Sequence, residues 1–364
     1  MNKRVACIGY GALTPVGNTP AECYKAADEG RSALTLHTGT FGCANPFVAS
    51  LFEDRSAIAD DYTFFDSLII RAASQAIESA GIDPASGRVA FVLSTIKGNI
   101  EFIGKQDISL PASAARMARY FNNPNPAIVV SNACISGLAA LVQGRRTMLT
   151  GKYDYVVVVG AEVQSHFIVS GFQSLKALSE RPCKPFDAGR DGLNLGEAAA
   201  AIVLGNSAYG WELADGAIRN DANHISGPSR SGEGSYNALR YILREAEIDD
   251  ISFINPHGTA TIYNDEMEAI AIDRAGLANV PLFGLKGCFG HTMGAAGILE
   301  SIISMMACDN KTILPTKGFE NLGVSVPVQV SAAKRSCTGL SFVKLLSGFG
   351  GVNGALLFKK GGQA

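Results

Sequence analysis

The chain has 364 residues, of which 47% are hydrophobic and 18% charged, a balance typical of a folded protein with one large core or two closely packed ones. Its 31 basic and 33 acidic residues give a net charge of −2, which gives no reason to expect a nucleic-acid partner or general membrane binding. No apolar run is long enough to span a bilayer, and the eight cysteines show neither C-x-x-C pairs nor the density of a disulfide scaffold. We therefore expect a cytoplasmic protein with reduced cysteines.

The N-terminal part alternates short apolar runs with helical patterns. Residues 4–8 predict a first strand, followed by a loop over residues 9–17. Residues 65–81 predict a helix, and residues 89–94 predict a buried strand. Residues 95–125 have little periodicity, which predicts short helices and loops near the surface or at a subunit contact.

The most informative stretch follows. Residues 127–130 predict a buried strand, and apolar residues recur at helical spacing over residues 138–149. Cys134 lies between them, so we expect it at a helix N-terminus, where backbone N–H groups and the helix dipole favour a nucleophilic thiolate and suit an oxyanion on an attached acyl group. A small core residue is the alternative interpretation of any single cysteine, but Ala133 and Gly137 leave room for a substrate.

The remaining strands predict the fold class. Residues 155–160 form an apolar run without polar alternation, as in a sheet covered on both faces, and a long loop over residues 182–197 leads to a strand at 198–204. Strands that alternate with helical patterns predict an α/β architecture with helices on both sides of the sheet.

The second half of the chain repeats the first in outline. The predicted strand 251–255 ends at His257, much as the strand over 128–132 ends at Cys134, and residues 346–358 predict a Gly-interrupted hairpin. This predicts two similar halves packed face to face, with Cys134 and His257 between them.

Two of the five histidines lie at Gly-flanked ends of elements. His257 follows a strand, and His291 opens a predicted helix, with Lys286 five positions before it. Each alone is more often a structural residue. Together with Cys134, however, two neutral imidazoles suit one reaction: the cysteine accepts an acyl group, and N–H donors stabilise the enolate left when a second substrate loses a carboxylate. A metal site is the alternative, but no third ligand has metal-like spacing.

Two carboxylates are further candidates. Glu300 shares a helix face with Ala296 and Ser304 rather than with charged residues, so it would suit a partner for Lys286 or His291. Asp265 is explained at least as well as a carboxylate at a helix N-terminus.

These motifs resemble the elongating β-ketoacyl-acyl-carrier-protein synthases of the thiolase superfamily. The resemblance runs from Arg4 to Phe358, and its strongest motifs are Asn132–Gly137, Lys184–Gly192, His257–Thr261, Lys286–Gly297 and Gly348–Gly354. It implies a thiolase-like five-layered αβαβα fold made of two similar halves. We place these at residues 1–205, with the nucleophilic cysteine, and 206–364, with the two histidines.

The resemblance also implies an activity: an acyl thioester is transferred to Cys134 and condensed, with loss of carbon dioxide, with malonyl-acyl-carrier-protein in fatty acid, polyketide or polyene biosynthesis. It implies no cofactor and no metal. Acyl- and malonyl-loaded carrier protein would be partners, together with an identical chain or a related ketosynthase chain in a dimer. The implied site residues are Cys134, His257 and His291 as catalysts, Lys286 tuning His291, Glu300 and Asp265 in support, Phe349 as gate and oxyanion donor, and Lys176 at the carrier protein.

The chain also departs from the family. It is short, mostly between Ser94 and Asn125, where the family builds part of the dimer interface and the floor of the acyl pocket. Residues 60–65 are acidic where relatives often carry basic carrier contacts. Short synthases of this kind resemble those of bacterial polyene or other specialised lipid pathways.

Three alternative functions belong to related proteins. A chain-length-factor-like partner subunit usually lacks the nucleophilic cysteine, which this chain retains. A degradative thiolase would carry a second catalytic cysteine near residues 348–354, which contain none. A starter-type synthase would use Cys, His and Asn, whereas His291 occupies the third position here.

Overall fold

Two units of one topology make up the main sheet. The computed structural model describes residues 4–244, 246–337 and 340–361, so the outermost residues of the two predicted halves, 1–3 and 362–364, lie outside the described residues. In the first unit the strand order is β1 (Ala6–Leu13), β8 (Ala198–Gly205), β6 (Tyr155–Glu162), β4 (Val89–Ser94) and β5 (Ile128–Val130). In the second it is β9 (Trp211–Asn220), β16 (Val352–Lys360), β15 (Ser341–Gly348), β10 (Ile251–Asn255) and β11 (Pro281–Leu282).

Strand directions repeat as well. In each unit the first two pairings of this order are antiparallel and the last two are parallel. A short antiparallel pairing of β1 with β9 joins the units, and β13 (Gln329–Val330) completes an 11-stranded sheet. The predicted division at 205/206 falls between the end of β8 and the start of β9, and it stays a prediction.

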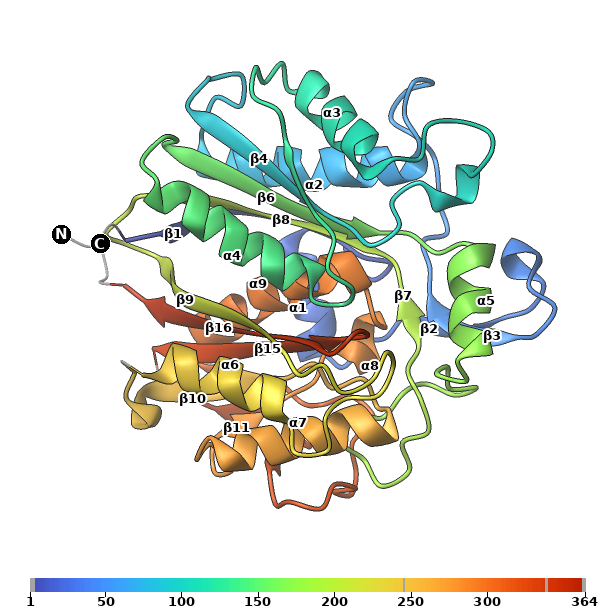
Figure 1. The fold of residues 1–364 in the computed structure, drawn as a ribbon, viewed down its shortest axis with the longest axis vertical. Coiled ribbons are helices and arrows are strands. Elements are labelled where there is room, and N and C mark those ends of the chain that lie inside the picture. The colour runs from blue at the N-terminus through green and yellow to red at the C-terminus, as the bar shows by residue number, and fades with distance from the viewer. Residues whose placement is uncertain (1–3, 245, 338–339, 362–364) are drawn as a thin grey trace.

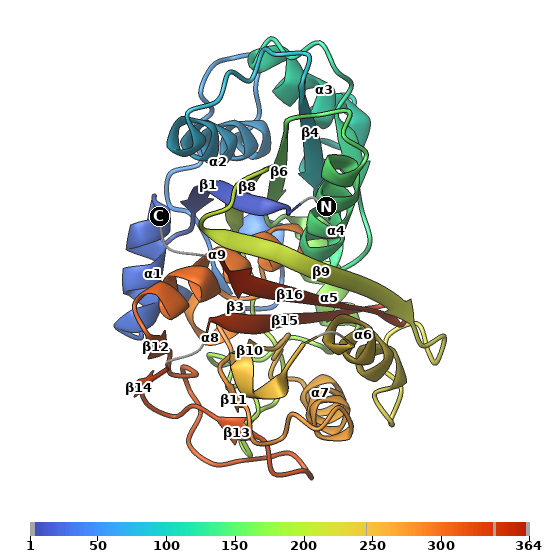
Figure 2. The same ribbon diagram turned by 90° about the vertical axis from the view of Figure 1, so that its left-hand side faces the viewer.

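Helices form three layers around the two units (Figures 1 and 2). Outside the first unit lie α2 (Phe64–Ala80) and α3 (Leu110–Tyr120), and outside the second lie α6 (Glu233–Leu243) and α7 (Ile262–Arg274). Between the units lie α1 (Pro20–Asp28), α4 (Ser136–Leu149) and α9 (Ala296–Asp309). The layers follow the predicted thiolase-like αβαβα order.

Smaller elements complete the chain. A three-stranded sheet joins β2 (Leu34–His37), β3 (Phe47–Ser50) and β7 (Leu195–Gly196), and β12 (Thr312–Ile313) pairs with β14 (Arg335–Ser336). Two short helices, α5 (His166–Ser174) and α8 (Lys286–Phe289), lie beside the first of these sheets in Figure 1. The 3-10 turns are η1 (Thr40–Gly42), η2 (Ile100–Phe102), η3 (Ile248–Asp250) and η4 (Met293–Ala295).

Separate apolar clusters hold the layers together. The middle cluster contains side chains from both units and from the helices between them, such as Ile202, Leu356, Leu138 and Ile302. A second cluster packs α2 onto the first unit, and a third packs α6 and α7 onto the second. None of the helices in the described ranges has the length and apolarity that a membrane crossing requires.

Two strand predictions were wrong in detail. The first strand does not stop at Ile8 but continues to Leu13. Gly11, in this extension, lets α2 pack closely on the strand, because a Cβ there would lie 2.0 Å from the carbonyl oxygen of Ala72. Second, β5 is half-buried rather than buried, because it is the edge strand of the first unit.

Candidate active site

The two central helices begin in backbone contact. A Cβ on Gly297 of α9 would lie 2.2 Å from the backbone nitrogen of Leu138, and a Cβ on Gly137 of α4 would lie 2.8 Å from the carbonyl oxygen of Gly294. Only glycine allows so close a crossing. It brings the segments that precede the two helices together in the middle of the molecule.

Cys134 and His291 occupy equivalent places in the two units. Cys134 follows β5, which is the third main-sheet strand of its unit in chain order, and precedes α4. His291 follows β11, which is the third main-sheet strand of the other unit in chain order, and precedes α9. His257 follows β10, a second strand. The predicted equivalence of His257 with Cys134 was therefore wrong. The prediction that His291 opens a helix was also inexact, because η4 intervenes before α9.

Cys134, His257 and His291 converge on one point. Their sulfur and ring nitrogen atoms lie within 4.8 Å of one another, and all three side chains are buried. The two imidazole rings stand edge to face, with centroids 5.0 Å apart and planes at 77°. The three residues line a cavity of about 430 Å³. The predicted meeting of Cys134 and His257 between the halves is thus present in the structure, with His291 beside them.

The surroundings of both histidines favour the neutral imidazole. Burial lowers the pKa of each imidazole well below its usual value, and the nearby ammonium of Lys286 lowers it further. The backbone N–H of Met293 donates to Nδ1 of His291 at 3.3 Å, so the ring proton lies on Nε2. Within the described part of the chain, His291 Nε2 and His257 Nδ1 are buried without a hydrogen-bond partner. The site therefore offers a buried N–H donor that is not engaged by the protein.

Cys134 sits in a strained turn. The preceding residue, Ala133, has φ of 46°, a left-handed conformation uncommon for a residue with a side chain. Main-chain N–H groups of Phe349 and of Cys134 itself reach the sulfur and lower its pKa. Burial has the larger effect, however, and raises the pKa of the thiol to about 11. Cys134 lies just before the N-cap of α4, as predicted. The expectation of a thiolate was wrong, because desolvation outweighs the N–H groups and the charge of Lys286.

This pKa predicts how Cys134 reacts with an alkylating reagent. Only the thiolate attacks iodoacetamide, so the alkylation rate should rise about tenfold per pH unit and still be rising at pH 9, whereas a peptide cysteine levels off near its pKa of about 8.5. Peptide mass spectrometry identifies the alkylated residue, and circular dichroism checks folding at each pH. A plateau near pH 7 would contradict the desolvated thiol.

Behind the histidines lies a buried cluster of charges. Nζ of Lys286 donates to Oε1 of Glu300 at 2.7 Å, and Lys344 donates to the other carboxylate oxygen, Oε2. Burial by itself would raise the pKa of Glu300, but the two ammonium groups together lower it. Sequence reasoning proposed Lys286 and Glu300 and missed Lys344. The available signal was a lysine inside the apolar run of residues 342–346.

Buried carboxylates that the sequence analysis missed hold the backbone around the site. Glu268 accepts hydrogen bonds from the N–H groups of His257 at 2.6 Å and Gly258 at 2.7 Å, and burial raises its pKa to about 7. Glu162 accepts from the N–H of Gly294 in η4, the turn before α9, at 3.1 Å.

Asp265 plays a similar backbone role. It lies in the first turn of α7, as its helix-terminal interpretation predicts, and accepts from the N–H groups of Phe186 at 2.7 Å and Ala260 at 3.2 Å. It is buried and does not line the cavity. The structure therefore places it in the support of the His257 loop rather than at the reacting atoms.

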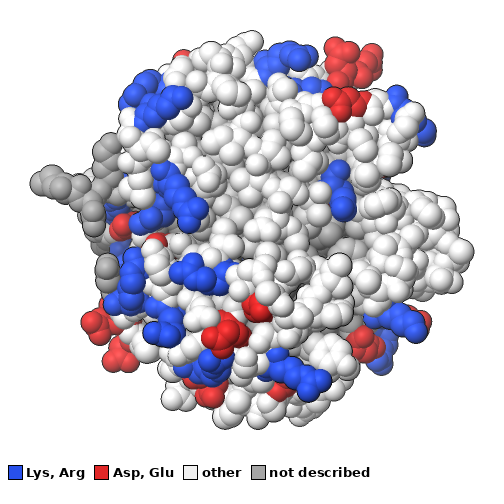
Figure 3. All heavy atoms as spheres, viewed as in Figure 1, with Lys and Arg blue, Asp and Glu red and all other residues white. Residues whose placement is uncertain are grey.

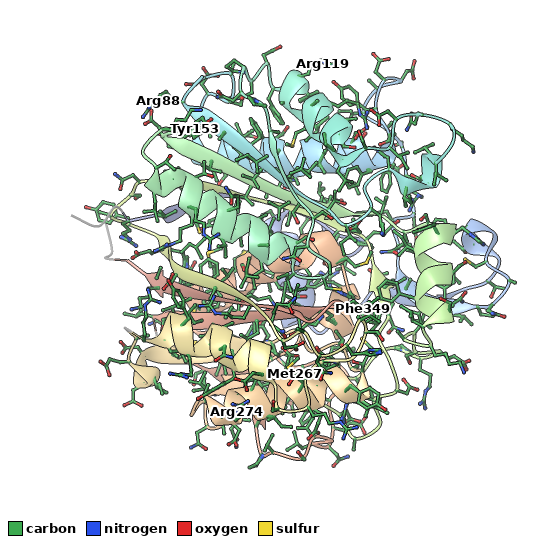
Figure 4. All side chains as sticks on the ribbon, viewed as in Figure 1. Arg88, Arg119, Tyr153, Met267, Arg274 and Phe349 are labelled. Atoms are coloured by element: carbon green, nitrogen blue, oxygen red, sulfur yellow. The ribbon has the colours of Figure 1, made fainter. Side chains whose placement is uncertain are left out.

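Apolar side chains surround the mouth of the cavity. We call Leu175, Ile262, Tyr263 and Phe349 the rim, because all four are exposed and line the cavity. Phe349 lies at the tip of the β15–β16 hairpin (Figure 4), where its ring stacks on Phe172 of α5 at 5.9 Å. Lys176 also lines the cavity, from an exposed position. Figure 3 shows that charged side chains on this face lie mostly around its edge, with few over its centre.

The three central side chains are also placed to ligate a metal ion. The sequence shows no third ligand with metal-like spacing, but in space Cys134 joins the two histidines. A metal would require the Cys134 thiolate, and burial disfavours that form. The arrangement suits a thiol nucleophile with two neutral imidazoles at least as well.

Comparisons with known proteins identify the family of this chain. A family model described as "Beta-ketoacyl synthase, N-terminal domain" matches residues 2–208, and one described as "Beta-ketoacyl synthase, C-terminal domain" matches residues 211–320. A 3-oxoacyl-[acyl-carrier-protein] synthase 2 from Vibrio cholerae is 29% identical, over 98% of this chain and 99% of the relative. A relative of the same name from Rhizobium meliloti is 30% identical, over 71% of this chain and 66% of the relative.

Solved structures share the fold. A chain from the complex of a ketosynthase with its chain length factor from Xenorhabdus doucetiae has a TM-score of 0.90 and 23% identity, with 98% of each chain covered. A beta-ketoacyl synthase from Burkholderia phymatum has a TM-score of 0.87 and 23% identity, over 98% of this chain and 99% of that chain.

Proposed function

This chain belongs to the β-ketoacyl synthase family, a family of acyltransferases, and we propose that it joins an acyl group held on Cys134 to a malonyl thioester with loss of carbon dioxide. The convergence of Cys134, His257 and His291 within 4.8 Å is the observation that carries the proposal. One nucleophile and two neutral imidazoles, enclosed in a cavity, are what the two half-reactions need.

In the first half-reaction the sulfur of Cys134 attacks the carbonyl carbon of an acyl thioester. Because the thiol has a pKa of about 11, it must lose its proton during the attack, and a neighbouring neutral imidazole accepts that proton. The N–H groups of Cys134 and Phe349, which reach the sulfur, would donate to the oxyanion that develops on the attacked carbonyl. The carbon–sulfur bond to the carrier then breaks, and the carrier thiol leaves with the proton.

In the second half-reaction the malonyl group loses carbon dioxide. The electron pair of the broken carbon–carbon bond becomes a thioester enolate, and N–H donors of His257 and His291 stabilise its oxygen. The enolate carbon attacks the acyl carbonyl on Cys134. Collapse of the tetrahedral intermediate breaks the bond from the acyl carbon to the sulfur and releases the β-ketoacyl thioester, and the sulfur takes up one proton that solvent supplies.

Intact-mass spectrometry of the purified protein tests this proposal. Incubation with a panel of acyl-carrier proteins should add the mass of one acyl group to the chain, and later addition of malonyl-carrier protein should remove it and yield a β-ketoacyl product. A folded protein that gains no mass with any acyl group would contradict the proposal. That result would point to the chain-length-factor-like alternative.

The proposed partners are a carrier protein and a second ketosynthase-type chain. Solved relatives support both kinds of partner: one structure holds a ketosynthase with its chain length factor, and another holds a type II polyketide acyl-carrier protein with its ketosynthase. In this chain β5 is a half-buried edge strand, where an identical or a related chain would pair. The cytoplasm is the proposed compartment, supported by eight free cysteines.

The rim is the surface on which the carrier protein would rest while its arm reaches Cys134, with Lys176 beside it. Tyr263 is 76% exposed there, so Tyr263→Ser should remove an apolar contact with the carrier. We expect the ratio of kcat/KM for the carrier-bound substrate to kcat/KM for a small thioester analogue to fall about tenfold. Tyr209→Ser is the matched control, because Tyr209 is 53% exposed and does not line the cavity. An equal loss with both substrates would contradict docking at the rim.

A further inference from the structure

Lys344 is a fully buried lysine in the middle of strand β15. Its Nζ donates to Oε2 of Glu300, to the carbonyl oxygen of Pro256 at 3.2 Å and to that of Asn255 at 3.5 Å. These acceptors come from α9 and from the end of β10, so one ammonium group connects three elements of the second unit. In the parallel pairing of β10 with β15, Lys344 lies opposite Asn255, which fixes this register.

A buried ammonium group costs several kcal/mol unless it is paired. The carboxylate of Glu300 pairs with it, but Lys286 already pairs with the same carboxylate at 2.7 Å. The cluster therefore contains two lysines and one glutamate. Lys286 and Glu300 alone would form a balanced pair, so Lys344 adds a positive charge that the pairing of Lys286 does not require.

The peptide carbonyls that Lys344 binds directly precede His257. On the other side of the same turn, Glu268 accepts the N–H groups of His257 and Gly258. The ammonium group of Lys344 thus binds the carbonyl groups of this turn, and the carboxylate of Glu268 binds its N–H groups. The same ammonium group fixes the second oxygen of Glu300 and thereby the partner of Lys286.

We propose that Lys344 is a positioning residue for the condensation described above: it fixes the backbone before His257 and the Lys286–Glu300 pair, and it places a positive charge behind the two imidazoles. This inference rests on the proposed function. It adds to the residues that would touch substrate a buried lysine, Lys344, that acts on the reaction through them.

The direction of the electrostatic effect follows from the groups around the imidazoles. Those groups are Cys134, Lys286 of α8, Lys344 of β15, Glu300 of α9, Glu268 of α7 and Glu162 of β6. Burial is the largest cause that lowers the pKa of each histidine, and the charges of Lys286 and Lys344 lower it further. Removal of Lys344 leaves fewer positive charges beside the rings, so both histidines should protonate at a higher pH.

Lys344→Met tests the proposal, because methionine keeps an unbranched apolar chain without the charge. Decarboxylation of malonyl-carrier protein is followed as a function of pH. It needs neutral imidazoles, so the acid limb of the variant's profile should move to higher pH, and kcat for condensation should fall at least tenfold with KM little changed. A purely structural role would lower stability but leave the acid limb of the folded enzyme in place, and that result would overturn the proposal.

Two further variants complete the experiment. Lys360→Met, in the neighbouring strand β16, removes a lysine whose partner is Asp309 and should keep the wild-type profile. Lys344→Arg keeps the charge and should retain the wild-type acid limb. If Lys344→Met does not fold, Lys344→Gln, which also removes the charge, takes its place: a limb moved to higher pH supports the proposal and an unmoved limb overturns it. Wild-type enzyme that decarboxylates no malonyl-carrier protein would instead disprove the proposed function.

Discussion

Replacing Cys134 with alanine should abolish condensation, by about a thousandfold or more, while malonyl decarboxylation continues. The sulfur is the atom that holds the acyl group, so without it no acyl-enzyme forms and the enolate has no acceptor. Decarboxylation needs the two imidazoles, whose positions depend on Met293, Glu268 and the buried lysines rather than on the sulfur. The two half-reactions should therefore separate in this variant.

Two measurements check that separation. Intact mass after incubation with acyl-carrier protein should show no acyl adduct, and release of carbon dioxide from malonyl-carrier protein should persist. Cys7→Ala is the control, because Cys7 is another buried thiol but lies in β1 and does not line the cavity. Condensation at the wild-type rate in Cys134→Ala would show that another residue is the nucleophile.

The central residues could be predicted because each follows a strand and has small neighbours in the sequence. His257 and His291 are visible as polar residues beside glycine, and Cys134 follows Ala133; each lies at a point where an apolar pattern stops. Lys344 and Glu268 could not be found in this way. Each lies within a strand or helix, and its partners come from other elements: Glu300 and the end of β10 for Lys344, and the His257 turn for Glu268.

The fold shows the same limit. Long strands such as β6 could be predicted, because each is an apolar run within one segment. The repetition of the two halves could be predicted in outline, because similar runs recur in both. The equivalence of Cys134 with His291 depends on β11, which has only two residues and therefore no pattern to detect. The pKa of Cys134 was misjudged for a related reason. A helix N-terminus is visible in a sequence, but the surrounding layers that remove water from the sulfur are not.

Replacing His291 with alanine should affect the opposite half-reaction from Cys134→Ala. Acyl transfer to Cys134 should still occur, because the sulfur, its N–H groups and His257 remain. Decarboxylation and condensation should fall about a hundredfold to a thousandfold, the loss typical for one donor to a developing oxyanion. His291 is suited to that role because its Nδ1 accepts from Met293 and its Nε2 proton has no partner among the described residues.

Three comparisons make this prediction specific. His291→Asn keeps an N–H donor and should fall between wild type and His291→Ala in decarboxylation rate. His257→Ala combined with His291→Ala should lose less than the product of the two single losses, because both donors serve the same enolate oxygen. His166→Ala, on the exposed surface of α5, should behave as wild type. If His291→Ala lost acyl transfer but kept decarboxylation, His291 would instead act as the base for Cys134, and the roles proposed for the two halves of the site would have to be exchanged.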